Sequence, residues 1–319
     1  MAGLSASGGF TGFFLPHGHV TFGIIVRLIE SMGKKAYNTG IKPRTDYQSM
    51  KTWLLVGLLI IIGTVTNASC SSSDDTSARP TIERIEQRGK ILVGTTGDYR
   101  PLSFCEPETG EYWGFGIEMA QEIAARLSVG IEFVQTSWPT LSADVLAEPQ
   151  MFDLAIGGIT ITDARRETML MSDGYLSNGK TILCRASEAD RYQSLADIDK
   201  PEVRVMVNPG GLNEKFAHDS LSQATIAVHQ KNEEIPALIA EGRADIMITE
   251  ITEAPYYVET DSRLAAPLLD KPFTHGEIGV LMRKGQDDLL QLVNAVISEM
   301  KSDGSLRRLH EKYGLLYNY

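Results

Sequence analysis

Cysteine is scarce in this 319-residue chain, which has only Cys70, Cys105 and Cys184. Two of them, Cys105 and Cys184, fall in the part that reads as a globular body, and two cysteines so far apart make no disulfide framework. Histidine is also sparse. The six histidines show no ligand-like spacing, and no Cys-x-x-Cys pair occurs. The sequence therefore predicts no metal site.

The chain also lacks an excess of basic residues, and its formal net charge is −11. Residues 1–70 hold 6 Lys and Arg against 2 Asp and Glu, which leaves 24 against 39, a balance of −15, for residues 71–319. Such a body repels nucleic acid and anionic membranes. We expect no nucleic-acid partner, and an anionic ligand must be attracted by a local group of positive charges.

Long apolar runs are missing except at 54–65, which is too short for a confident membrane span. Met50-Lys51 precedes this run and small residues follow it, an order typical of an export signal. We therefore predict that Met50 is the true start, that residues 1–49 are an upstream extension from a mis-assigned start codon, and that residues 50–70 are a signal peptide. The alternative is a cytoplasmic extension before a signal anchor.

Cys70 resembles the lipid-bearing cysteine of bacterial lipoproteins, although Asn67 stands where that motif prefers leucine. Cleavage after Ala68 without a lipid stays open, and residues 71–81 form a polar tether. The expected location is the periplasm, either soluble or lipid-anchored to a membrane through Cys70. The oligomeric state is left open, homo-oligomers included.

Hydrophobic content of 43% is enough for two packed lobes, and strand and helix patterns alternate along the body. Strands are expected at 91–94, 131–135, 153–156, 181–184, 203–207, 225–229, 245–248 and 278–283. Helices are expected at 82–87, 117–127, 165–169, 213–217, 232–240, 252–259, 287–301 and 305–313.

This alternation predicts an α/β protein with parallel sheets and helices on both of their faces. Residues 82–184 and 278–319 would form lobe 1 and residues 185–277 lobe 2, with crossings near Cys184 and Glu277. A cleft between lobes is the default ligand site, and two crossings make a hinge.

Arg165 is the first candidate site residue. It falls in the first turn of a helix that follows the buried strand 153–156 and Gly157-Gly158, at a strand end where open α/β sheets bind ligands. A guanidinium with the Thr160 hydroxyl beside it suits a small carboxylate. This stretch alone also allows Arg165 to be a solvated residue on a helix surface.

Several segments resemble known families. The segments GTTGDYRP (94–101), GFGIEMA (114–120), the Arg165 segment, KSDG (301–304) and EKY (311–313) resemble the periplasmic amino-acid-binding proteins of transport systems. Within that superfamily, TSWP (136–139), NGKT (178–181), VNPGG with NEKFA (207–217) and ITEITEA (248–254) resemble the cyclohexadienyl dehydratases.

The resemblance covers about residues 82–315 and implies a two-lobed periplasmic-binding-protein-like fold with a hinged inter-lobe cleft. It also implies a carbon-oxygen lyase that converts prephenate to phenylpyruvate and arogenate to phenylalanine. Protonating the ring hydroxyl and releasing carbon dioxide aromatises the ring, so no cofactor is needed. The alternative is an amino-acid-binding protein that serves a transporter.

The same resemblance implies a substrate site. Tyr99 and Trp138 would hold the substrate ring, although each is also a reasonable packing residue. Lys180 would join Arg165 in pairing the two carboxylates, although lysines at such positions are usually solvated.

The segment from Asn208 through Gly210 and Gly211 to Asn213 opens a helix after a buried strand, so its backbone amides would bind a carboxylate or hydroxyl. A tight turn with Asn213 as the helix cap is the plainer alternative. Leu212 departs from the family pattern, where threonine would offer a hydroxyl.

Glu250 and Glu253 follow the strand 245–248 and are expected to face the cleft. Glu250 takes the position where binding proteins pair the α-amine of the ligand, and Glu253 the position of the general acid of the dehydratases. Both would be ordinary first-turn carboxylates on the alternative view, and a helix dipole would then lower the pKa. Burial, the neighbouring carboxylate and a dianionic substrate would raise the pKa of Glu253, as an acid requires.

Overall fold

The computed structural model describes residues 80–318. The chain divides between Asp74 and Asp75, and all described residues belong to the second unit, Asp75–Tyr319. The predicted start at Met50, the export signal, Cys70 and most of the tether lie outside the described residues. Between residues 80 and 318, no helix combines the length and apolar character that crossing a bilayer requires.

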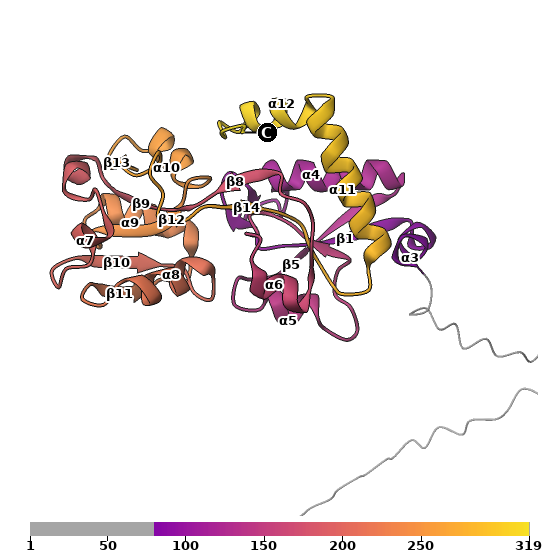
Figure 1. Ribbon diagram of the computed structural model, residues 1–319, viewed down its shortest axis with the longest axis horizontal. Helices are drawn as coiled ribbons and strands as arrows, with labels where there is room; N and C mark the ends of the chain where they lie inside the picture. Colours follow the sequence, from indigo (N-terminus) through magenta and orange to yellow (C-terminus); the bar gives the residue numbers. More distant parts are fainter. Residues whose placement is uncertain (1–79, 319) are drawn as a thin grey trace, which may run out of the picture. The chain divides into compact units, whose positions relative to one another are not determined.

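Lobe 1 is built on a five-stranded sheet of order β5-β1-β6-β15-β7 (Figure 1). β1 (Lys90–Thr95) lies between β5 (Gly130–Gln135) and β6 (Leu154–Ala155) and is parallel to both. β15 (Leu281–Met282) runs antiparallel to β6 and to β7 (Leu170–Met171). The parallel half of this sheet is the part that the alternating pattern predicts.

Helices cover both faces of this sheet because strand side chains alternate between the faces. Ile91 and Val93 of β1 belong to one core cluster, and Leu92 packs against a second cluster on the opposite face. The first cluster includes residues of α3 (Thr81–Arg88), α4 (Phe115–Leu127), α11 (Asp287–Ser302) and α12 (Ser305–Lys312), and the second includes α5 (Leu141–Val145). α6 (Asp163–Thr168) connects β6 to β7.

Lobe 2 is built on a second five-stranded sheet of order β11-β10-β12-β9-β13. β10 (Arg204–Val207) is parallel to β11 (Thr225–Val228) and β12 (Ile246–Glu250), and β9 (Lys180–Arg185) is antiparallel to β12 and β13 (Leu264–Ala265). One core cluster includes Ala217 of α8 (Leu212–Ser220) and Ile198 of α7 (Leu195–Ile198), and the other includes residues of α9 (Ile235–Ala240) and α10 (Ala254–Thr260). The helical segments of this lobe are η2 (Ala186–Arg191), α7 (Leu195–Ile198), α8 (Leu212–Ser220), η3 (Asn232–Glu234), α9 (Ile235–Ala240) and α10 (Ala254–Thr260).

Two short strands join the sheets. β8 (Leu176–Asn178) pairs antiparallel with β14 (Gly276–Ile278), and Figure 1 shows this pair between the two lobes. Each strand leads directly from one sheet toward the other, so the pair is the crossing at which the lobes can hinge.

The fold class is as predicted, a two-lobed α/β fold with a cleft between its sheets. Three expectations were wrong in detail. The sheets are mixed and not purely parallel, because the strands that cross between lobes enter each sheet from the opposite direction. The strand expected at 181–184 was assigned to lobe 1, but as β9 it bonds to β12 and β13 of lobe 2. The strand expected at 278–283 is divided into β14 and β15.

A small three-stranded sheet after β1 was not predicted. It consists of β2 (Asp98–Tyr99), β3 (Ser103–Cys105) and β4 (Tyr112–Trp113). Strands of two or three residues are too short to show an alternating pattern. This sheet matters to function because β2 carries Tyr99 into the cleft.

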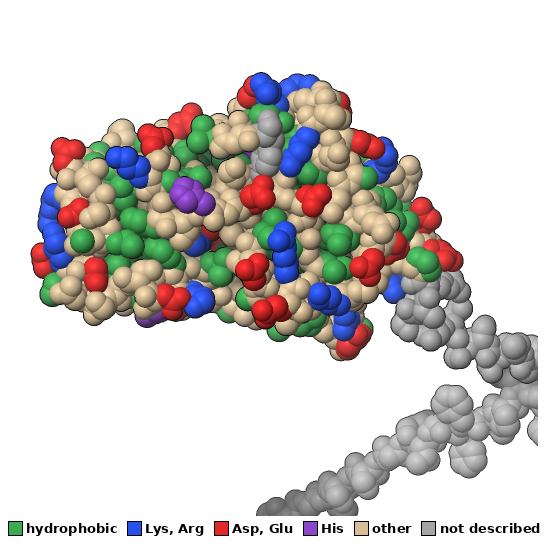
Figure 2. All heavy atoms as spheres, viewed as in Figure 1, with side chains coloured by type: hydrophobic (Ala, Val, Ile, Leu, Met, Phe, Trp, Pro, Cys, Tyr) green, Lys and Arg blue, Asp and Glu red, His purple; other side chains and the backbone are tan. Residues whose placement is uncertain are grey.

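The surface of the unit mixes charges of both signs. Acidic and basic side chains are interspersed over the face drawn in Figure 2. The described unit also has exposed ion pairs, such as Arg126 with Glu299 and Lys215 with Asp219. The negative balance of the body is therefore spread over its surface, and the positive charges that matter for a ligand are the buried ones described next.

Candidate active site

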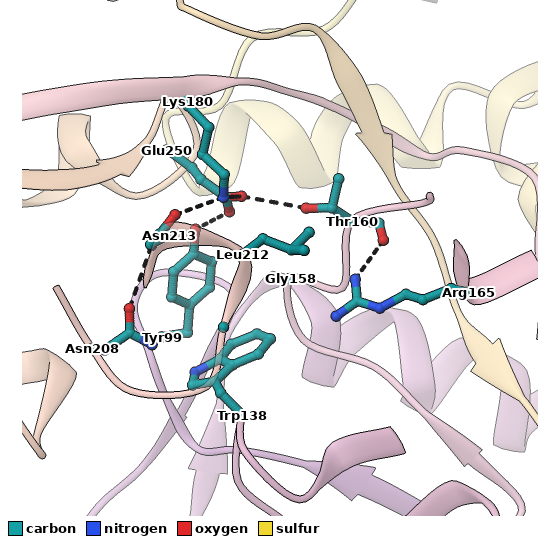
Figure 3. A pocket seen from close by; sticks show the side chains of 11 residues that line it. Tyr99, Trp138, Gly158, Thr160, Arg165, Lys180, Asn208, Leu212, Asn213 and Glu250 are labelled. Carbon is teal, nitrogen blue, oxygen red and sulfur yellow. Dashed lines mark hydrogen bonds and ion pairs between the residues drawn. The ribbon is translucent and has the colours of Figure 1, made fainter. Parts of the chain in front are cut away.

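A small pocket lies in the cleft between the lobes (Figure 3). Its free volume is about 20 Å³, which is room for about one water molecule. The residues that line it come from the strand ends and loops of both lobes: Tyr99, Trp138, Gly158, Thr160, Arg165, Lys180, Asn208, Gly211, Leu212, Asn213 and Glu250. Nine of the eleven residues predicted from the sequence are in this set, and Gly210 and Glu253 are not.

Arg165 reaches the pocket from α6. The helix begins after Thr162, whose side-chain oxygen accepts a hydrogen bond from the Arg165 backbone amide (3.2 Å). The Arg165 Nη1 donates to the carbonyl oxygen of Thr160 (2.5 Å), which aims the guanidinium along the pocket wall. Burial lowers the pKa of Arg165 from its ordinary value. Arg165 is therefore a partly buried cation, whereas its neighbour Arg166 is exposed on the helix surface.

Lys180 and Glu250 form a buried ion pair inside the pocket. The Lys180 Nζ donates to Glu250 Oε1 (2.5 Å) and to Asn213 Oδ1 (2.6 Å), and the two charged side chains are 8% and 6% exposed. Their positions follow from the sheet register, because Lys180 of β9 is opposite Glu250 of β12. Lys180 is thus not a solvated lysine.

Glu250 also connects the lobes. Its Oε2 accepts a short hydrogen bond from the Tyr99 hydroxyl, and its Oε1 accepts one from Thr160 Oγ1 (3.3 Å). Burial would raise the pKa of Glu250, but the Lys180 ammonium and the hydrogen bonds from Tyr99 and Asn178 outweigh it, and the pKa is lowered. Glu250 is therefore an ionised carboxylate at neutral pH, paired with a cation and tied to lobe 1.

Aromatic rings form one wall of the pocket. The Tyr99 and Trp138 rings meet edge to face with centroids 5.5 Å apart. The Trp138 Nε1 donates to Asp98 Oδ1 (3.0 Å), which fixes the indole. Gly158 has φ +100°, and a Cβ there would lie 2.5 Å from the Tyr99 ring, so only glycine allows the ring to lie against this backbone.

The segment before α8 supplies amides from lobe 2. Asn213 Nδ2 donates to Asn208 Oδ1 (3.5 Å), and both side chains are buried. Gly211 lines the pocket at the start of the helix, and Leu212 lies beside it. Gly210 lies outside the pocket, where a Cβ would come 2.5 Å from Pro139 of lobe 1. Its role is therefore close approach between the lobes and not ligand contact.

Glu253 lies behind the pocket and is 0% exposed. Thr249 Oγ1 donates to its Oε2, and Asn232 Nδ2 donates to its Oε1 (2.6 Å). Burial raises the pKa of Glu253 to about 8, with further increases from the charges of Glu250 and Asp98, while the two hydrogen bonds oppose the shift. The carboxyl is therefore mostly protonated at neutral pH.

Three residues of this site were not predicted as site residues: Asp98, Asn232 and Thr249. Asp98 and Thr249 directly precede Tyr99 and Glu250, so proximity in sequence was an available signal. Asn232 offered none, because it stands among exposed and half-exposed residues in the segment Lys231–Glu234.

Cys105 and Cys184 are both free thiols. Among residues 80–318, no group of three or more His, Cys, Asp or Glu side chains is placed to hold a metal ion. The charged groups of the pocket are thus Arg165, Lys180 and Glu250, with the neutral Glu253 behind them.

Comparison with known proteins agrees with this architecture. The model of the bacterial extracellular solute-binding proteins, family 3, matches residues 91–315. The cyclohexadienyl dehydratase of Pseudomonas aeruginosa is 40% identical over 205 residues, which cover 64% of this chain and 75% of that protein. The L-cystine-binding protein TcyJ of Escherichia coli is 28% identical over 73% of this chain and 85% of that protein.

Among solved structures, the ancestral amino-acid-binding protein AncCDT-1, described as a precursor of cyclohexadienyl dehydratase, matches with a TM-score of 0.67 and 36% identity. The match covers 73% of this chain and 99% of that structure. Taken with the fold and the cleft, these matches establish that the chain belongs to family 3 of the bacterial extracellular solute-binding proteins.

Proposed function

We propose that this chain is a cyclohexadienyl dehydratase, a lyase that converts prephenate to phenylpyruvate and arogenate to phenylalanine with loss of water and carbon dioxide. The 40% identity to the Pseudomonas aeruginosa enzyme supports the assignment. Transport proteins of the same family are less similar, as the 28% identity to the cystine-binding protein illustrates.

The observation that carries the proposal is Glu253. The ring hydroxyl of either substrate is a poor leaving group unless it is protonated as it departs. A general acid must hold its proton at the working pH, and burial raises the pKa of Glu253 to about 8. Two carboxylates with opposite protonation states in one site are a recurring arrangement for acid chemistry, and here Glu250 is ionised while Glu253 is neutral.

The reaction then balances without any further reagent. Glu253 gives its proton to the ring hydroxyl, the carbon-oxygen bond breaks, and water leaves. The electron pair of the carbon-oxygen bond leaves with the water, while the electron pair of the bond between the ring and its carboxylate enters the ring and carbon dioxide departs. The ring becomes aromatic, and Glu253, left as a carboxylate, regains a proton from solvent.

Binding groups for the substrate are present on both lobes. Arg165 and Lys180 supply two cations for two carboxylates, and Asn208 and Asn213 supply amides. Tyr99 and Trp138 offer ring surfaces to the six-membered ring. Holding the substrate between these groups also excludes water from the reacting centre.

Substrate entry requires the cleft to open. A free volume of about 20 Å³ does not hold a substrate of this size, and Glu253 lies behind the pocket wall. We therefore expect the substrate to displace the links from Tyr99 and Thr160 to Glu250 as it enters. In the occupied cleft Glu253 would meet the ring hydroxyl.

The direct test is to incubate the purified protein with prephenate and to follow the absorbance of phenylpyruvate in alkali. The dehydratase proposal predicts enzyme-dependent formation of phenylpyruvate, and of phenylalanine from arogenate. A protein that is inert toward both substrates yet binds an amino acid would instead be a transport protein.

The family is described as extracellular, which supports export from the cytoplasm. We propose that Met50 is the start, that residues 50–70 are the export signal, and that the mature protein works in the periplasm. Intact-mass measurement of protein from its native source tests this. A mature mass beginning near residue 70 is expected, with or without a lipid on Cys70, and a cytosolic protein that retains residues 1–49 would contradict it.

A further inference from the structure

Asn232 is a fully buried polar residue in a surface segment. It is the first residue of η3, and its neighbours Lys231 and Glu234 are exposed while Asn232 is 0% exposed. Burying an amide costs free energy unless its hydrogen bonds are satisfied. The buried Asn232 amide therefore needs hydrogen-bond partners in the interior.

Both hydrogens of the Asn232 amide are used. The Nδ2 donates to Glu253 Oε1 (2.6 Å) and to the carbonyl oxygen of Asp98 (3.2 Å). Among residues 80–318 the Asn232 Oδ1 has no hydrogen-bond partner. The hydrogen bonds of this side chain are therefore the two that its nitrogen donates, to Glu253 and to Asp98.

The two acceptors belong to different lobes. Glu253 precedes α10 of lobe 2, as Asn232 precedes α9, whereas Asp98 is on β2 of lobe 1. The bond to Asp98 crosses the cleft and exists only while the lobes are together. The same side chain thus links the carboxyl of Glu253 to the backbone of lobe 1 in the closed state.

We propose that Asn232 is a positioning residue for the proton donor: it holds the Glu253 carboxyl in a fixed place relative to lobe 1 as the cleft closes. This inference rests on the proposed role of Glu253 as the general acid. Thr249 holds the second carboxyl oxygen from within lobe 2, so among the hydrogen bonds of residues 80–318 it is Asn232 that connects the acid to the opposite lobe.

Charged and titratable groups surround this carboxyl on every side. Glu250 lies on its own segment and Asp98 on β2, and the charges of both raise the pKa of Glu253. Burial and the neighbouring carboxylates raise the pKa of the Tyr99 and Tyr257 phenols well above the ordinary value. Among these neighbours, Asn232 and Thr249 provide the opposing influence, because a donor to a carboxylate favours its charged form.

The test is Asn232→Leu, which keeps the approximate volume and removes both hydrogen bonds. The titration of the Glu253 carboxyl carbon is followed by carbon-13 NMR in the full-length protein, with Glu253→Gln identifying the signal. We expect the titration midpoint in Asn232→Leu to rise by about one unit. Turnover of prephenate should fall roughly ten- to a hundredfold, with the loss mainly in kcat because Asn232 does not line the pocket.

Asn294→Leu is the matched control. It is the same substitution at a half-buried asparagine of α11 that accepts a hydrogen bond from the Asp173 amide, far from the cleft. It should leave the Glu253 titration and turnover as in the parent. If Asn232→Leu does not fold, Asn232→Ser replaces it, because one hydroxyl hydrogen serves only one of the two acceptors.

Three outcomes separate the claims. A risen midpoint with reduced kcat supports the positioning role. A lower melting temperature with an unmoved Glu253 titration means a structural role only and overturns it. A parent protein inert toward prephenate and arogenate overturns the dehydratase proposal, and the NMR titration then decides by itself whether Asn232 governs Glu253.

Discussion

The two lobes contribute different chemistry to the cleft. Lobe 1 offers the Tyr99 and Trp138 rings and the Arg165 guanidinium, which suit holding a flat ring and a carboxylate. Lobe 2 offers the buried Lys180–Glu250 pair and the neutral Glu253. On the proposed function, lobe 1 would mainly orient the substrate, while lobe 2 would carry the group that reacts.

Two carboxyl groups within lobe 2, those of Glu250 and Glu253, also differ. Glu250 and Glu253 are three residues apart and both are buried, yet the pKa of Glu250 is lowered and that of Glu253 is raised. The difference comes from their partners, because the Lys180 ammonium donates to Glu250, whereas Glu253 accepts hydrogen bonds from a hydroxyl and an amide and lies near the charges of Glu250 and Asp98. Burial alone does not determine the protonation of a carboxyl, and the neighbouring charge decides it.

Removing the orienting cation of lobe 1 should have the largest effect. In a Glu253→Gln background, which keeps the substrate intact, Arg165→Ala should weaken prephenate binding by about 3 to 5 kcal/mol, since a buried carboxylate loses its partner. Calorimetric titration measures the difference. Arg166→Ala, an exposed neighbour, is the control, and equal affinities for the two variants would show that Arg165 does not bind the substrate.

Breaking the ion pair of lobe 2 should affect stability. Lys180→Met leaves Glu250 buried without its cation and should lower the free energy of unfolding by about 3 kcal/mol. Adding Glu250→Gln should restore part of that loss, because the unpaired charge is removed. Denaturant unfolding of both single variants and the double variant measures this coupling, and strictly additive effects would contradict the pair.

Glu253 should make stability depend on pH. Its pKa is raised from 4.5 to about 8 in the folded protein, so the folded state holds a proton that the unfolded state has released. The free energy of unfolding from this group is therefore greatest below pH 4.5 and declines by at most about 1.4 kcal/mol per pH unit up to about pH 8. Unfolding across this range should show the slope in the parent and lack it in Glu253→Gln. An identical slope in the two proteins would contradict the raised pKa.

The smallest effect concerns substrate choice. Glu250 is the carboxylate of the pocket, and it would pair with the ammonium of arogenate. Prephenate has a keto group at that place and would not use this partner. Glu250→Gln should lower kcat/KM for arogenate by roughly tenfold and should spare prephenate by comparison. Steady-state kinetics with both substrates measures the ratio, and an equal loss for both would remove Glu250 from amine recognition.

The sequence predicted most of the long elements because their apolar residues repeat with a clear period. α11 shows this best, since Leu289, Val293, Val296, Ile297 and Met300 are spaced to form one buried face. The short strands of the β2-β3-β4 sheet had no such period. The lobe of β9 could not be predicted either, because strand pairing is a long-range property that a local pattern does not contain.

For the site, residues at strand ends were predictable and their partners were not. Arg165 and Asn213 follow buried strands, and the pocket is built there. The ion pair of Lys180 with Glu250 depends on the register of β9 against β12, and the contact of Asn232 with Asp98 depends on lobe closure. Neither relation is local in sequence.

The central claim is that Glu253 protonates the leaving hydroxyl, and a crystal structure of Glu253→Gln with prephenate bound tests it most directly. Glutamine keeps the reach of glutamate but releases no proton, so turnover should fall by roughly two to four orders of magnitude and the substrate should persist in the cleft. The account predicts that the amide at position 253 lies within about 3 Å of the ring hydroxyl, with the prephenate carboxylates on Arg165 and Lys180. An amide at position 253 that lies out of hydrogen-bond reach of the ring hydroxyl in the occupied cleft, or a variant that retains the turnover of the parent, would contradict it.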